Sequence, residues 1–127
     1  MSFVTGLGGI FFKSRNPTGL ARWYREVLGV PADPDSASWA FPWRDQNGER
    51  GYTVWGVFRS STSYFGNSGQ PFMINLRVSD LDGALKRLRE AGAQVDDRVE
   101  KTVEGRFGWF VDPNGRRVEL WEPAPED

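Results

Sequence analysis

Few side chains in this sequence can do chemistry, because its 127 residues include neither cysteine nor histidine. Without cysteine there are no disulfides, thiolate nucleophiles or iron–sulfur clusters. Without histidine there is no Ser-His-Asp triad, no imidazole base and no imidazole metal ligand. Any reaction must use carboxylates, Lys, Arg, Tyr, Ser/Thr or the backbone. The net charge of −1 disfavours a nucleic-acid binder that depends on a basic surface.

The chemistry-bearing residues gather on one face of several predicted strands. In the last strand, alternation places Arg117, Glu119 and Trp121 on one side, with Val118 and Leu120 under a helix. The same argument selects alternate residues in the strands around residues 9–13, 53–57 and 73–78. The predicted lining consists of Phe11, Lys13, Trp55, Met73, Asn75, Arg77, Arg117, Glu119 and Trp121. An aromatic and apolar lining with a few convergent polar groups suits a small organic molecule.

A structural alternative stands beside each of these roles. Glu119 can pair with Arg77 or Arg117 purely to hold the strands together, and Trp55 and Trp121 can be core filler. Asn75 is the most informative, because a central strand accepts an amide only where its hydrogen bonds are met.

Two helices and several strands must position these residues. Asn16-Pro17 is a helix start and Gly29 a helix stop, with apolar residues between them at helical spacing. This first stripe comprises Leu20, Trp23, Tyr24, Val27 and Leu28. Asp80 and Gly92 bound the second helix, whose apolar face comprises Leu81, Ala84, Leu85 and Leu88.

The two halves of the chain repeat the same order of elements. The helix caps Asn16 and Asp80 are 64 residues apart, and the Asn-Gly hairpins 45–48 and 112–115 follow in each half. The predicted strands are 7–14, 38–44, 52–58, 72–78, 107–111 and 116–121. We predict one α+β domain over 1–127, made of two tandem β-α-β-β-β modules at 5–65 and 71–123, with a loose tail at 124–127.

The motifs of the doubled module resemble the vicinal oxygen chelate superfamily, which contains glyoxalase I, bleomycin-resistance proteins and extradiol dioxygenases. Residues 112–123 (DPNGRRVELWEP) are similar to its closing D-P-x-G-x-x-x-E-L-x-x-P signature. Residues 16–29 and 74–82 are similar to its first helix and to the entry of its second module. The resemblance implies a curved mixed sheet that forms a cup around a ligand.

The resemblance also implies where a divalent metal would be held. Carried over at the 64-residue offset, the four ligand positions fall on Gly9, Trp55, Met73 and Glu119. Only Glu119 offers an oxygen, and one carboxylate does not make a zinc or magnesium site. We therefore expect no metal and no cofactor, which disfavours glyoxalase I-type isomerisation and ring-cleaving oxygenation.

Two functions of the resembled family remain open at this point. The first is metal-independent binding or sequestration of a small molecule, as in the bleomycin-resistance branch. The alternative is a lyase or isomerase in which Glu119 transfers a proton beside Arg77 or Lys13, with or without a weakly held divalent metal. Whether the protein is an enzyme stays undecided.

A third possibility is a purely structural module without a cavity. An RNA-recognition strand at residues 105–111 is disfavoured, because only a strand follows where that fold needs a helix.

The sequence has no stretch of apolar residues long enough to span a membrane and no signal-peptide pattern. We expect a cytoplasmic protein with a small-molecule ligand and no nucleic-acid or membrane partner. The resemblance to the family also implies that the protein forms a homodimer.

Overall fold

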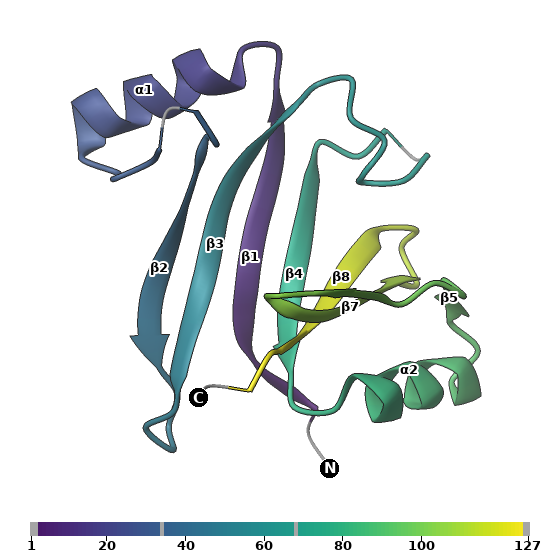
Figure 1. Cartoon of the computed structure of the whole chain (residues 1–127). Coiled ribbons are helices and arrows are strands. Elements are labelled where there is room, and N and C mark those ends of the chain that lie inside the picture. Colours follow the sequence, from purple (N-terminus) through teal and green to yellow (C-terminus); the bar gives the residue numbers. More distant parts are fainter. Residues whose placement is uncertain (1–2, 34, 68, 126–127) are drawn as a thin grey trace. The chain divides into compact units, whose positions relative to one another are not determined.

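The computed structural model of the chain describes residues 3–33, 35–67 and 69–125. These residues form two compact units, one of 3–8 with 74–125 and the other Gly9–Met73. Figure 1 shows their helices and strands, most of them labelled. The module bounds 5–65 and 71–123 remain a prediction, and part of the expected tail 124–127 lies outside the described residues. At its N-terminus the chain divides differently, since residues 3–8 group with the second helix.

The unit Gly9–Met73 contains most of β1 (Val4–Ser14), α1 (Pro17–Leu28), β2 (Ser38–Arg44) and β3 (Arg50–Arg59). Strand β3 is parallel to β1 and antiparallel to β2. Only two strands follow the helix among the described residues of this module, and an isolated bridge joins Asp33 to Ser38.

The other unit contains β4 (Phe72–Val78), α2 (Leu81–Glu90), β5 (Gln94–Val95), β6 (Glu100–Thr102), β7 (Gly105–Val111) and β8 (Arg117–Pro123). Its strand order is β1-β4-β8-β7-β5, with β6 beside β7. The β4–β8 pair is parallel and the β7–β8 pair antiparallel. The predicted α+β class, with a mixed sheet and two helix-bearing modules, is confirmed.

Local chemistry sets the ends of both helices. The side chain of Asn16 accepts a hydrogen bond from Gly19 N at 3.0 Å, and Gly29 closes α1 with a left-handed φ of 77°. Asp80 caps α2 in the same way through Gly83 N at 3.1 Å. The sequence signals for both helices are therefore confirmed.

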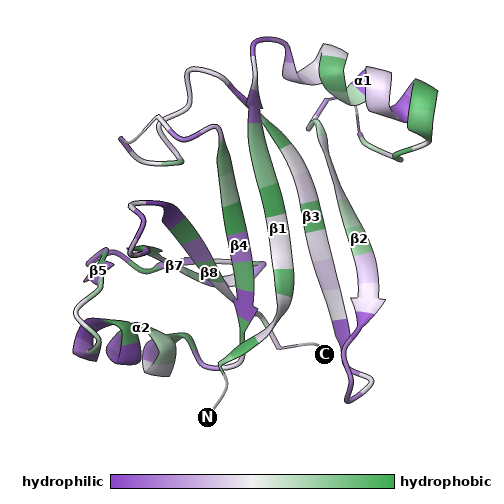
Figure 2. Ribbon diagram, turned by 180° about the vertical axis from the view of Figure 1, so that it is seen from behind, coloured by the Kyte–Doolittle hydropathy of each residue, from purple (hydrophilic) through white to green (hydrophobic). Residues whose placement is uncertain are grey.

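The two helices bury different amounts of their apolar stripes. Helix α2 packs Leu81, Ala84 and Leu85 against Val78 and Leu120, as the strand alternation predicts. Helix α1 buries Ala21 with Leu20 packed beside it. The last turn of α1 is hydrophobic in Figure 2, yet Val27 and Leu28 are 58% and 67% exposed. The last turn of α1 therefore leaves part of the predicted apolar stripe at the surface.

Candidate functional site

A polar cluster lies on the face of β4, β7 and β8 that is opposite α2. Asn75 pairs with Glu119 across β4 and β8, and Glu119 pairs with Trp109 across β8 and β7. Because Leu76 and Leu120 pack toward α2, alternation turns their strand neighbours to the other face. This polar cluster comprises Asn75, Arg77, Trp109, Arg117 and Glu119.

Glu119 is the centre of the polar cluster. Asn75 Nδ2 donates to Glu119 Oε1 at 2.5 Å, and Trp109 Nε1 donates to Glu119 Oε2 at 3.0 Å. Glu119 and Asn75 are each only 2% exposed, and Trp109 is fully buried. A buried carboxylate needs hydrogen-bond donors to offset the loss of water, and here each oxygen has one. Neutral N–H groups of the protein therefore stabilise the carboxylate.

Two arginines surround the indole of Trp109. The guanidinium carbons of Arg98 and Arg117 lie 4.7 and 5.4 Å from the ring centroid. Arg117 also forms an ion pair with Asp96, at 3.0 Å between Nη2 and Oδ2. The guanidinium of Arg117 is thus held by the aromatic face of Trp109 and by the carboxylate of Asp96.

The side chain of Asn75 also contains an unsatisfied hydrogen-bond acceptor among the described residues. Its Oδ1 is buried and accepts no hydrogen bond from the described residues. A Cβ on Gly8 would collide with that oxygen and would lie 3.1 Å from Trp121 Cε3, so glycine leaves room for the amide. A buried acceptor without a donor is costly unless water or a ligand supplies one.

The other predicted lining residues have partners of their own. Trp121 Nε1 donates to Glu104 O at 2.8 Å and its ring stacks on Phe107, which is the filler role considered from the sequence. In the unit Gly9–Met73, Phe11 packs on Phe58 and the Lys13 ammonium lies 5.3 Å from the Phe65 ring. Met73 is buried. Ligand binding by these four residues stays a prediction.

Trp55 lies on the opposite face from the one predicted. Its ring centroid is 5.2 Å from that of Tyr24 in α1 and 5.4 Å from that of Phe12, within the core under α1. The strand register explains the error. Phe11 pairs with Gly56, and Phe11 is the repeat counterpart of Asn75, which pairs with Glu119. The counterpart of Glu119 is therefore Gly56, and a shift of one residue reverses the face.

The corrected register also changes the expected metal-ligand positions, and it makes a metal site less plausible. The four family positions become Gly9, Gly56, Met73 and Glu119, and only Glu119 carries an oxygen ligand. Both of its oxygens accept N–H groups, and neither an amide nitrogen nor an indole N–H is a metal ligand. No group of three or more acidic side chains able to hold a metal occurs in residues 3–33, 35–67 and 69–125. These residues do not fit a divalent metal site.

Sequence reasoning missed Trp109, whose indole N–H donates a hydrogen bond to Glu119. A signal was present, since the Asn-Gly hairpin at 112–115 sets the register of its two strands. That register places Trp109 opposite Glu119. Asp96 carried no such signal, because the strand β5 before it has only two residues.

Comparison with known proteins identifies the family of the chain. Residues 9–121 match the family model of the glyoxalase-like domain, so the chain belongs to the glyoxalase-like family, within the vicinal oxygen chelate superfamily. No curated protein matches the sequence.

Solved structures cover nearly all of the chain. Methylmalonyl-CoA epimerase from Mycobacterium tuberculosis is 22% identical over 98% of this chain and 92% of its own, with a TM-score of 0.64. A variant of the Streptomyces coelicolor epimerase in complex with 2-nitronate-propionyl-CoA is 16% identical over 96% and 99%, with a TM-score of 0.70. NAD-dependent benzaldehyde dehydrogenase from Legionella pneumophila is 12% identical over 91% and 98%, with a TM-score of 0.57. At these identities the likeness concerns the fold.

Proposed function

We propose that this glyoxalase-like protein binds a small organic molecule without a metal, at the polar cluster around Glu119. The observation that carries the proposal is the pair of N–H donors on the Glu119 carboxylate, from Asn75 and Trp109. Those donors engage both oxygens of the one carboxylate that falls on an expected metal-ligand position. Binding rather than metal chemistry is then the function that these residues support.

The unmet acceptor of Asn75 indicates the chemistry of the ligand. Because Asn75 Oδ1 is buried without a donor from the described residues, a hydroxyl or amide N–H of a ligand would complete it. Two methylmalonyl-CoA epimerase structures of similar fold are complexes with coenzyme A thioesters, 2-nitronate-propionyl-CoA and methylmalonyl-CoA, which supports an oxygenated ligand here. We propose an oxygenated organic ligand with at least one hydrogen-bond donor.

The test is to identify small molecules released from protein purified in the presence of EDTA, by unbiased mass spectrometry. We expect a compound released in near-equal amount to the protein, and at least tenfold less of it from Asn75→Leu. Leu76→Val is the matched control, because Leu76 lies on the α2 side of the same strand. Loss of the compound in EDTA, or equal retention by both variants, would contradict the proposal.

The alternative of a lyase or isomerase makes a different prediction in the same experiment. If the released compound is converted by the wild type, and Glu119→Gln binds it without converting it, Glu119 is a proton-transfer group. We expect binding without conversion, because both carboxylate oxygens are already engaged.

The homodimer and the cytoplasmic location also remain proposals. The exposed residues Trp23, Val27 and Leu28 on α1 are apolar surface that a second copy of the chain could cover. Sedimentation equilibrium tests the dimer. No helix in the described residues has the length and apolarity needed to cross a bilayer.

A further inference from the structure

Two exposed turns of this protein contain an asparagine followed directly by a glycine, Asn47-Gly48 and Asn114-Gly115. In this sequence an asparagine side chain reacts readily with its own backbone, because glycine has no side chain to hinder the approach. The first pair lies in the hairpin turn between β2 and β3, and the second lies in the turn between β7 and β8. The polar cluster around Glu119 uses neither turn, so a reaction there is independent of the proposed function.

The reaction is deamidation through a cyclic imide. The glycine nitrogen forms a bond to Cγ of the asparagine, the Cγ–Nδ2 bond breaks, and the proton lost by the glycine nitrogen leaves with the ammonia. A water molecule then opens the ring. Attack at Cγ gives aspartate, whereas attack at the backbone carbonyl carbon gives isoaspartate, in which the chain runs through the side chain. Each event consumes one water, releases one ammonia and leaves one new carboxylate.

The closed turns block this reaction, because the glycine nitrogen is already engaged. Gly48 N donates to Asp45 O at 2.9 Å, and Gly115 N donates to Asp112 O at the same distance. The side chain of each aspartate accepts two further backbone N–H groups of its own turn. Each turn must therefore open before its asparagine can react, and the rate follows the free energy of local opening.

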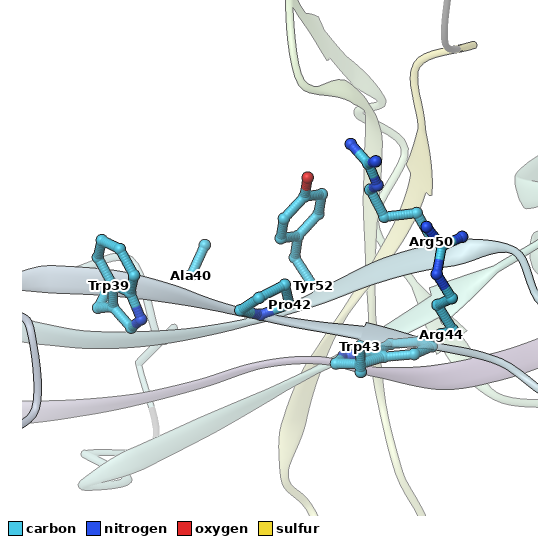
Figure 3. Close-up of a pocket in the computed structure, with 7 residues that line it drawn as sticks. All are labelled: Trp39, Ala40, Pro42, Trp43, Arg44, Arg50 and Tyr52. Atoms are coloured by element: carbon cyan, nitrogen blue, oxygen red, sulfur yellow. The ribbon is translucent and has the colours of Figure 1, made fainter.

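The first hairpin has little to keep it closed. Strand β2 pairs only with β3 among the described strands, and none of its residues is buried. The pair next to the turn is Arg44 with Arg50, and like charges directly opposite one another destabilise a strand pair. Figure 3 shows both arginine side chains at the same end of the hairpin. One hydrogen bond, from Arg44 Nη1 to Gly48 O at 2.9 Å, acts against this repulsion.

The second hairpin lies inside its sheet. Strand β8 lies between β4 and β7, and β7 also pairs with β5 and β6. Near its turn Phe110 is opposite Val118, and Phe110 and the buried Leu120 belong to the core under α2. This turn also has Pro113 where the first turn has Gln46. Proline at that position restricts the open chain and so favours the closed turn.

We propose that Asn47 is the site at which this protein deamidates, to isoaspartate and aspartate, while Asn114 is protected by its hairpin. The product has one more negative charge, in the turn between Arg44 and Arg50. The isoaspartate form also adds one carbon to the backbone at that turn. The protein thereby acquires a second charge form as it ages, at the edge strand of the first module.

Peptide mapping by mass spectrometry, on protein kept in mildly alkaline buffer, measures both sites in one sample. In the folded protein we expect Asn47 to be lost at least fivefold faster than Asn114. In concentrated urea the two rates should agree within twofold, because opening no longer limits either reaction. The urea arm separates the effect of the fold from that of the neighbouring residues.

The Gln46→Pro variant gives the first turn the Asp-Pro-Asn-Gly sequence of the second. It should slow the loss of Asn47 at least threefold in the folded protein and leave the rate in urea within twofold. The reciprocal variant, Pro113→Gln, should lose Asn114 faster than the wild type does, yet more slowly than the wild type loses Asn47.

Three results would overturn the proposal. The first is equal loss of Asn47 and Asn114 from the folded wild type. The second is a preference for Asn47 that persists unchanged in urea. The third is a Gln46→Pro variant with the circular dichroism of the wild type that loses Asn47 just as fast.

Discussion

The two modules hold equivalent strand positions with opposite chemistry. In the second module Asn75 and Glu119 are opposite one another on β4 and β8, buried and hydrogen-bonded. In the first module the equivalent pair on β1 and β3 is Phe11 and Gly56, where the phenyl ring lies over the glycine and packs on Phe58. The same strand register thus supports either a polar pair or an aromatic ring on glycine. The polar chemistry around a buried carboxylate belongs to the second module.

The largest expected effect concerns the helices of the two modules. Leu85→Ala in α2 should lower the free energy of unfolding by about 2–5 kcal/mol, because Leu85 is buried against Val78 and Leu120. Val27→Ala in α1 is the control and should change it by less than about 0.5 kcal/mol, because Val27 is exposed. Urea unfolding of both variants measures the difference. Equal losses would mean that α1 is as well packed as α2.

An intermediate effect is expected at Glu119. In Glu119→Gln the new amide group turns an N–H toward either Asn75 Nδ2 or Trp109 Nε1, which are both donors. We expect a loss of about 1–3 kcal/mol in urea unfolding, the usual cost of an unmet buried polar group. Gly56→Ala is the comparison in the first module, since a Cβ there would lie 3.2 Å from Phe11 Cδ1 and must displace it slightly. A Glu119→Gln variant as stable as the wild type would show that the two donors do not hold the carboxylate.

The smallest expected effect on stability comes from an ion pair at the surface, between Arg106 and Asp82. Arg106 donates a hydrogen bond to Asp82 at 2.8 Å and so holds the pKa of that carboxyl below its usual value of 3.8. The pair therefore stabilises the fold above the unfolded-state pKa, and the contribution disappears as the pH falls through the folded-state pKa. Asp82→Asn should melt slightly lower than the wild type near neutral pH, and the two curves should converge in acid. A gap that persists in strong acid would rule out this ion pair as its cause.

Much of the fold could be predicted, because its signals are local. The caps Asn16 and Asp80, the stop at Gly29 and the two Asn-Gly hairpins each act within a few residues. The alternation that puts Leu120 under α2 is confirmed for the same reason. The short strands β5 and β6 were not predicted, since segments of two and three residues carry no periodicity.

The candidate site was only partly predictable. Asn75 and Glu119 could be placed together by strand alternation, but Trp55 was placed on the wrong face by an offset that is one residue too long. Trp109 was missed because aromatic residues are usually core filler, and its role depends on one indole N–H. Composition and periodicity cannot predict a contact that depends on a single register position or on a single atom.

The measurement that tests the central claim most directly is equilibrium dialysis of the wild type and Glu119→Gln against Zn²⁺ and Mn²⁺. The account holds that N–H groups of Asn75 and Trp109, and not a metal, satisfy the Glu119 carboxylate. It predicts that neither protein takes up a stoichiometric ion and that the two curves coincide. Uptake of one ion per wild-type chain, abolished by Glu119→Gln, would contradict it.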